Sequence, residues 1–172
     1  MSDPIAAARL QGRTGMEIVP TRLARQVEDY WRACRDGGDE DYIPRRRDID
    51  PAAFGRLLPQ VFLLDVAGPE ARPRWRLVGS AIARREGSDP TGRWLDESLM
   101  PEQAQVMARF VQLTVRERRP SCHAGCWRDA EDRLQLSARL LAPFSEDGTV
   151  VSTLLGLIDY APGEIVPLRG AA

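Results

Sequence analysis

Apolar and polar residues alternate along several short stretches of this chain, with the two-residue period that is typical of half-buried β-strands. The clearest stretch is 133–144, whose alternating apolar residues are Leu134, Leu136, Ala138, Leu140 and Ala142. Four further stretches predict strands, and they cover residues 60–66, 75–78, 121–128 and 149–160. The pattern therefore predicts two strands in the first half of the chain and three in its last part.

Apolar residues spaced three to four positions apart predict helices elsewhere in the chain. The first helix covers 21–36, with Thr21 as its cap. Its apolar face consists of Leu23, Val27, Tyr30, Trp31 and Cys34. Further helices are predicted at 51–58, 80–86 and 101–119, where proline or glycine marks their ends. The apolar face of the first helix needs a surface to cover, and this surface is either its own domain or a second copy of the chain.

This order of elements predicts an α+β fold, in which a five-stranded antiparallel sheet has helices on one face and an N-terminal helical extension. Four segments follow from the pattern. They are a flexible N-terminal arm at 1–20, the helical extension at 21–58, a core at 59–161 and a C-terminal tail at 162–172.

Length and composition fit one soluble domain. The chain has 172 residues, of which 43% are hydrophobic and 28% charged, and its formal net charge is -1. This balance gives no overall attraction to nucleic acid or to an anionic membrane. All basic residues are arginine, which excludes Schiff-base lysine chemistry and a phosphate-loop lysine. No signal peptide and no apolar run of about 18 residues is visible, so we expect a cytoplasmic protein.

The sequence Cys122-His123-Ala-Gly-Cys126 is the one cluster that could be a metal or redox site. On a strand, Cys122 and Cys126 share a face about 13 Å apart while His123 faces away. One metal ion with sulfur bonds of about 2.3 Å cannot join them in that geometry. A zinc site would need this segment to be a loop and a fourth ligand such as Cys34. We expect ordinary strand residues; a metal site, a ligand-lining thiol and a redox thiol are the alternatives.

Five short motifs together resemble a compact bacterial PAS family, which is best known from alphaproteobacteria and often occurs as small stand-alone proteins. The motifs are Ile43-Pro-Arg-Arg-Arg-Asp-Ile-Asp-Pro51, Leu58-Pro59, Phe62-Leu-Leu-Asp65, Arg76-Leu-Val-Gly-Ser80 and Gly87-Ser-Asp-Pro-Thr-Gly-Arg93. The resemblance extends from Trp31 to Tyr160. Pro90 departs from it, because the family favours an apolar residue such as leucine there.

The resemblance implies a PAS-like sensory or regulatory module without catalytic activity, which binds a small molecule or a partner protein and often dimerises through an N-terminal helix. The residues that such a fold would place around its cavity are Trp75, Leu77, Ile82, Trp94, Met107, Phe110, Val111, Leu136 and Ala138. These residues either fill a core or line a ligand pocket. The residues expected at an interface are Leu23, Val27, Tyr30 and Trp31. The resemblance leaves the cofactor unknown.

Known cofactor and catalytic chemistries find little support. PAS domains that bind haem carry a histidine on the helix before the third strand, and residues 101–119 contain none. The asparagine-cysteine-arginine motif of flavin photosensors is absent. Ser121 lies near the lone His123, but no nucleophile, base and orienting acid are arranged together, and there is no glycine-rich nucleotide fingerprint.

Three hypotheses follow. The first is a non-enzymatic PAS-type regulatory protein, a homodimer that acts in signal transduction by binding another signalling protein. The second is a sensor that binds a small molecule or cofactor in the cavity between sheet and helices. The third is a metal or thiol protein built on Cys122. Neither a nucleic acid nor a membrane is an expected partner.

Overall fold

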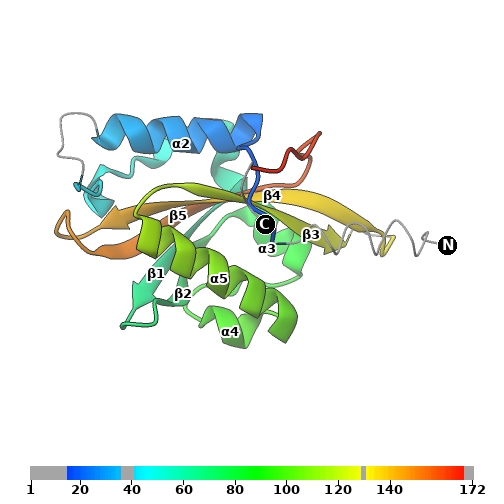
Figure 1. Cartoon of the computed structure of the whole chain (residues 1–172). Helices are drawn as coiled ribbons and strands as arrows, with labels where there is room; N and C mark the ends of the chain where they lie inside the picture. The colour runs from blue at the N-terminus through cyan, green and yellow to red at the C-terminus, as the bar shows by residue number, and fades with distance from the viewer. Residues whose placement is uncertain (1–14, 36–40, 129–130, 169–172) are drawn as a thin grey trace.

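One five-stranded antiparallel sheet forms the centre of the molecule and carries helices on both faces (Figure 1). The computed structural model describes residues 15–35, 41–128 and 131–168. Along the sheet the strands follow the order β2-β1-β5-β4-β3. The strands are β1 (Val61–Ala67), β2 (Arg72–Val78), β3 (Ser121–Arg128), β4 (Leu134–Ser145) and β5 (Val151–Asp159). The predicted α+β fold with five antiparallel strands is thus confirmed.

The helices form two layers around this sheet. They are α2 (Arg22–Arg35), the 3-10 helices η1 (Arg46–Asp48) and η2 (Pro51–Gln60), α3 (Ser80–Glu86), α4 (Leu95–Ser98) and α5 (Pro101–Glu117). In Figure 1, α2 lies above the sheet, whereas α4 and α5 lie below it. The helical extension therefore covers the face opposite to α5, and the sheet has no bare face along β4 and β5.

Each face of the sheet has its own hydrophobic core. The α2-side core contains Val27 and Trp31 of α2 together with Ala138, Leu140 and Ala142 of β4. The α5-side core contains Ile82 of α3, Met107, Phe110 and Val111 of α5, and Leu141, Leu154 and Ile158 of the sheet. Successive residues of a strand point to opposite faces, so β4 contributes its even-numbered residues to one core and its odd-numbered residues to the other.

Helix α2 is fixed to the sheet at both of its ends. The Thr21 hydroxyl oxygen accepts a hydrogen bond from the Ala24 amide at 3.3 Å, which confirms Thr21 as the cap. The same hydroxyl donates to the buried carboxylate of Asp159 at 2.8 Å. Near the other end, the indole N–H of Trp31 donates to the carbonyl of Pro143 at 2.6 Å. These bonds orient the apolar face of α2 toward its own sheet.

Segments from both ends of the chain cover the outer edge of β3. The Gly15 amide donates to the Ala124 carbonyl at 2.9 Å, and the Ala124 amide donates to the Met16 carbonyl at 2.8 Å. Residues 165–168 then lie against this segment, since the Val19 amide donates to the Val166 carbonyl at 2.8 Å. An edge strand offers unpaired backbone groups that such segments satisfy. Parts of the predicted N-terminal arm and C-terminal tail therefore pair along this edge of the sheet, while 1–14 and 169–172 lie outside the described residues.

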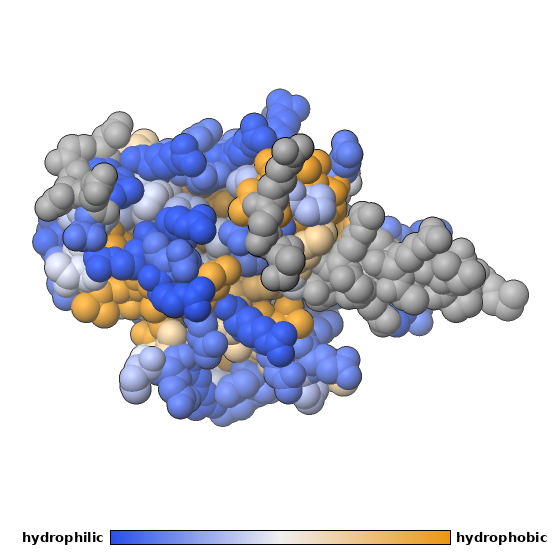
Figure 2. All heavy atoms as spheres, viewed as in Figure 1, coloured by the Kyte–Doolittle hydropathy of each residue, from blue (hydrophilic) through white to orange (hydrophobic). Residues whose placement is uncertain are grey.

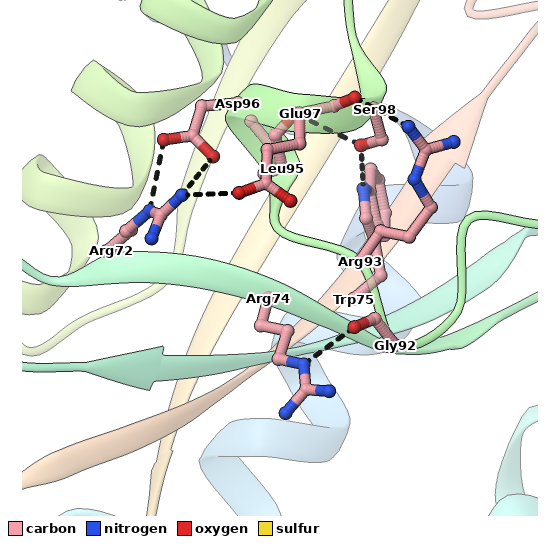
Figure 3. A network of polar contacts seen from close by, with 9 residues as sticks. All are labelled: Arg72, Arg74, Trp75, Gly92, Arg93, Leu95, Asp96, Glu97 and Ser98. Atoms are coloured by element: carbon pink, nitrogen blue, oxygen red, sulfur yellow. Dashed lines mark hydrogen bonds and ion pairs between the residues drawn. The ribbon is translucent and has the colours of Figure 1, made fainter.

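A polar network attaches β2 to α4 at the opposite edge of the sheet (Figure 3). The Arg72 guanidinium bonds to both carboxylate oxygens of Asp96 at 3.0 Å and to Glu97 at 3.1 Å. The indole N–H of Trp75 donates to the Ser98 hydroxyl at 2.8 Å. This network holds α4 against the sheet, so that Leu95 is buried beneath it.

The surface in Figure 2 is mainly hydrophilic over the outward sides of α2 and α5, and hydrophobic residues show mostly between these two layers. Within the described ranges, none of the helices has both the length and the apolar character that crossing a membrane requires. The distribution agrees with two helical layers that each turn an apolar face toward the sheet.

Candidate functional site

Five of the predicted cavity residues belong to the packed α5-side core. Their side chains are at most 5% exposed, and they are Trp75, Ile82, Met107, Phe110 and Val111. The ring of Phe62 packs edge-on against Trp75 with centroids 5.4 Å apart, so the space around that indole is filled. In the described part of the chain these residues fill a core, and none of them lines the pocket described below.

The other four predicted cavity residues lie elsewhere. Leu136 and Ala138 belong to the α2 side of the sheet, because their positions on β4 point away from α5. Leu77 is 47% exposed on the edge strand β2. The half-buried Trp94 packs against the Arg72 guanidinium, which lies 4.2 Å from its ring centroid. The predicted cavity lining is therefore wrong for these residues.

The four predicted interface residues pack against other residues of the same chain. Val27 and Trp31 are 0% and 3% exposed, and Leu23 and Tyr30 are packed against the same core. The Tyr30 hydroxyl donates to the Asp48 carbonyl and accepts from the Asp50 amide. Val27 and Trp31 are therefore core residues of their own chain, whereas Leu23 and Tyr30 are partly buried and their assignment to an interface stays a prediction. The packing does not test whether the chain is a homodimer.

A pocket of about 770 Å³ opens at the end of the sheet where the β3–β4 hairpin meets α3 and the start of α5. Its volume lies within the range of about 300–1,000 Å³ that ligand sites occupy. Its lining residues are Arg85, Glu86, Met100, Glu102, Gln103, Val106, Cys126, Trp127, Arg128, Leu134 and Arg139. We call it the hairpin pocket.

Five buried polar atoms have no hydrogen-bond partner among the described residues, and two of them belong to Trp127 and Arg139, which line the pocket. The five atoms are His123 Nδ1, Trp127 Nε1, Ser137 Oγ, Arg139 Nε and Tyr160 Oη. All five belong to the sheet face that carries α5: His123 pairs with Arg139 across β3 and β4, and Arg139 pairs with Ile158 of the α5-side core. Buried polar atoms normally have hydrogen-bond partners. Five such atoms without partners on one sheet face therefore make this face a candidate for a functional site.

An aromatic cage holds the Arg85 side chain of α3 beside the pocket. Its guanidinium carbon lies 4.2 Å from the ring centroid of Trp127 and 4.3 Å from that of Tyr160. The two rings meet edge-on with centroids 5.3 Å apart. Burial raises the pKa of Tyr160 to about 12, so its phenol is neutral at physiological pH. These contacts connect α3 with the ends of β3 and β5.

Gly125 provides the room in which Arg139 and Ser137 lie. A Cβ atom at this position would be 2.8 Å from Arg139 Nε and 2.8 Å from Ser137 Oγ, which is closer than real Cβ contacts. Ser137 is also the residue that pairs with Gly125 across the two strands. A glycine inside a strand often marks such a close approach. Here it allows the guanidinium to lie across β3.

A chain of hydrogen bonds fixes the proton positions on His123. The Thr114 hydroxyl donates to the Phe110 carbonyl at 2.8 Å, so the Ser121 hydroxyl must donate its proton to Thr114 Oγ1 at 2.6 Å. Ser121 Oγ then accepts from His123 Nε2 at 2.9 Å. The tautomer is therefore Nε2–H, and Nδ1 is left as an acceptor. Burial lowers the pKa of His123 to about 4, which keeps the ring neutral.

This Ser121 and His123 pair is not arranged for nucleophilic catalysis. A catalytic histidine accepts the proton of the serine hydroxyl, whereas here the imidazole donates and the serine proton goes to Thr114. Ser121 and His123 are 6% and 1% exposed, so a substrate has little access to either. The pair instead connects β3 to α5.

The cysteines and the histidine point to opposite faces, as the strand alternation predicts. Cys122 lies in the α2-side core, while His123 stacks on Phe110 on the other side. Burial raises the pKa of the Cys122 thiol to about 12, so it stays protonated and unreactive. Across the described ranges, no group of three or more histidine, cysteine or acidic residues is placed to hold a metal ion.

Sequence reasoning missed Trp127 and Arg139, which line the hairpin pocket, and the buried polar side chains of Ser137 and Tyr160 on the same sheet face. Two signals were available. The polar residues of 133–144 alternate with the apolar ones and so share one face, and Gly125 interrupts the strand opposite Ser137. Both signals indicate a polar patch on an inner sheet face.

The chain is similar to several solved structures. The PAS domain of BvgS from Bordetella pertussis is 18% identical with a TM-score of 0.48, over 64% of this chain and 79% of that one. The PAS domain of the histidine kinase ThkA is 12% identical with a TM-score of 0.42, over 58% and 98%. No curated protein matches the chain. The family model described as a PAS domain matches residues 19–159, so the chain belongs to the PAS domain family.

Proposed function

We propose that this PAS domain is a non-enzymatic sensor that binds a small molecule in the hairpin pocket. This is the second of the three sequence hypotheses, and one observation carries it: five buried polar atoms without partners gather on the sheet face under α5, and Trp127 and Arg139 among them line the pocket. A ligand pocket differs from a packed core in just this way, because a few polar groups converge on the same space.

The energetic argument concerns the cost of these atoms. A buried donor or acceptor without a partner destabilises the folded state by about 1–3 kcal/mol. A ligand that hydrogen-bonds to one of these atoms offsets part of that cost, and this part contributes to its affinity. Departures of this kind from full polar satisfaction are expected at functional sites.

Two contacts connect the pocket wall with the helices and supply a route for a signal. The His123–Ser121–Thr114 chain joins β3 to α5, and the caged Arg85 joins β3 and β5 to α3. A ligand that moves Trp127 would change the contact of that ring with Arg85. In this proposal α3 and α5 have two packing arrangements, and the ligand shifts the population toward the one that it binds more tightly. The size of the shift depends on the difference between the ligand's affinities for the two arrangements.

We further propose that ligand binding changes how this sensor contacts another signalling protein. The first hypothesis, regulation through protein binding, then describes the step that follows ligand binding. The apolar face of α2 is packed on the sheet, so the partner surface lies elsewhere unless α2 is displaced. Homodimer formation belongs to the same proposal.

Native mass spectrometry of protein purified without added ligand tests the sensor proposal. We expect a mass in excess of the denatured mass, and we expect the Arg139→Gln variant to lose it. Arg116→Gln is the matched control, because Arg116 is 72% exposed on α5 and bonds to Glu117 rather than to the pocket. If the unaltered protein, purified from several expression hosts, shows no mass beyond that of the polypeptide, the sensor proposal is contradicted. That result would favour a domain that acts only by binding another protein. The same spectra report the oligomeric state.

A further inference from the structure

We propose that the hairpin pocket takes a small organic monocarboxylate with an apolar body, whose carboxylate binds Arg139 and the Trp127 indole N–H. This inference rests on the proposed function and specifies its ligand class. Three features of the pocket carry it: the balance of donors and acceptors, the charges of its lining and the apolar surface beside them.

Donors predominate among the buried atoms without partners. Arg139 Nε and Trp127 Nε1 can only donate, and the hydroxyls of Ser137 and Tyr160 can donate as well as accept. His123 Nδ1 is the single obligatory acceptor in the group, since Nε2 carries the ring proton. A ligand rich in acceptors complements this set better than one rich in donors.

The charges of the lining favour one negative charge on the ligand. Arg85, Arg128 and Arg139 face two acids, Glu86 and Glu102, which leaves one net positive charge. Arg128 lies 3.4 Å from the Asp132 carboxylate, and Arg85 is held in its aromatic cage. Both acids are exposed, whereas Arg139 is half-buried on the sheet wall. Burial strengthens the interaction of a charge with a ligand beside it, so Arg139 is the favoured anchor.

The guanidinium of Arg139 also has the right shape for a carboxylate. Its one direct contact with a described residue that meets hydrogen-bond criteria is a long one, from Nη2 to the Cys126 carbonyl at 3.5 Å. A planar guanidinium binds a carboxylate through two parallel N–H donors, a geometry that a single spherical charge does not require.

Apolar surface beside these donors accounts for the body of the ligand. The ring of Trp127, the partly buried Leu134 and Val106, and the 69% exposed Met100 all line the same pocket. An inorganic anion would leave this surface in water. An aryl or alkyl group attached to the carboxylate would cover it and gain the free energy of apolar burial.

Isothermal titration calorimetry with two matched probes tests the inference on the full chain. Sodium 4-phenylbutyrate has a carboxylate and an apolar body, and 4-phenylbutyramide has the same body without the charge. We expect the carboxylate to bind at least about tenfold more tightly than the amide, and Arg139→Gln to weaken its binding by at least about tenfold. Arg116→Gln should leave the affinity unchanged.

A second variant distinguishes loss of binding from loss of folding. Trp127→Phe keeps an aromatic ring and removes the indole donor, so we expect weaker carboxylate binding with an unchanged thermal midpoint. Equal affinity for both probes, full affinity in Arg139→Gln or binding of neither probe would overturn the carboxylate inference. Binding of the amide alone would overturn it while leaving the sensor proposal intact. If the native spectra show a bound molecule that is not a carboxylic acid, the carboxylate inference is overturned while the sensor proposal stands.

Discussion

His123 of β3 stacks face to face on Phe110 of α5, with ring centroids 3.7 Å apart and ring planes at 15°. The imidazole is held from two sides, because its Nε2–H also donates to Ser121, which in turn bonds to Thr114 of the same helix. A neutral imidazole can stack in this way without the desolvation cost of a charged ring. The pair therefore fixes the position of α5 over β3, next to the hairpin pocket.

Removal of this stack should destabilise the fold. We expect His123→Ala to lower the free energy of unfolding by about 3 kcal/mol, since a buried ring is deleted and a cavity is left. His123→Phe keeps a ring against Phe110 and loses only the bond to Ser121, so its cost should be about 1–2 kcal/mol. Urea denaturation measures both. Equal losses for the two variants would show that the stack contributes little.

The pH dependence of stability should report His123 directly. The unfolded chain takes up a proton at about pH 6.5, whereas the folded protein resists protonation until about pH 4. Between these values the unfolded state binds more protons, so stability rises with pH. The contribution is complete above about pH 6.5, is lost as the pH falls toward about 4, and is on the order of 3 kcal/mol.

The control for this measurement is His123→Phe, which has no titrating ring at that position. We expect the unaltered protein to be the more stable of the two at about pH 7 and the less stable at about pH 4.5, because the pH-dependent loss exceeds the cost of about 1–2 kcal/mol of the substitution. A difference that stays constant over this range would mean that the ring is protonated equally in the folded and unfolded states.

Substitution of Gly125 should displace the groups that surround the pocket. The new Cβ in Gly125→Ala would lie 2.8 Å from both Arg139 Nε and Ser137 Oγ. We expect a loss of about 1–3 kcal/mol in stability and weaker ligand binding. Ser137→Ala is the matched variant: it removes a buried hydroxyl without a partner, so stability should be unchanged or slightly higher. Unaltered stability and binding in Gly125→Ala would contradict this close packing.

The sequence was sufficient to predict most helices and strands, and to predict which residues of a strand share a face. The glycine at 87 marks the end of α3 because it adopts a left-handed conformation there, with φ of 75°. The alternation of Cys122 and His123 placed them on opposite faces, which excludes a shared metal ion. Both predictions depend only on local backbone geometry, which is why a single sequence could supply them.

The candidate site could not be predicted in the same way, because it depends on which sheet face each helix covers. The apolar residues of β4, such as Leu136 and Ala138, were expected to face a cavity under α5. Since α2 covers the opposite face, they pack there, and the polar residues Ser137 and Arg139 turn toward α5. A helix that folds onto its own sheet and one that pairs with a second copy have the same amphipathic pattern.

Trp31 provides the test of this placement of α2. Its ring is 3% exposed, and its indole N–H donates to Pro143 of β4. We expect Trp31→Ala to lower the free energy of unfolding by about 3–5 kcal/mol and Trp31→Phe by less. Light scattering should show the same mass for the unaltered protein and Trp31→Phe. A changed mass together with unaltered stability would return Trp31 to an interface between molecules.

The hydrogen-bond state of the tryptophan indoles gives the most direct view of the pocket. Trp31 and Trp75 donate to Pro143 and Ser98, whereas the Trp127 indole N–H has no partner among the described residues. In a ¹H–¹⁵N spectrum titrated with sodium 4-phenylbutyrate, the Trp127 indole resonance, assigned with Trp127→Phe, should move downfield as it gains an acceptor. The Trp31 resonance, on the opposite face of the sheet, should stay in place. A Trp127 resonance that does not move, or that moves no more than that of Trp31, would contradict a ligand site in the hairpin pocket.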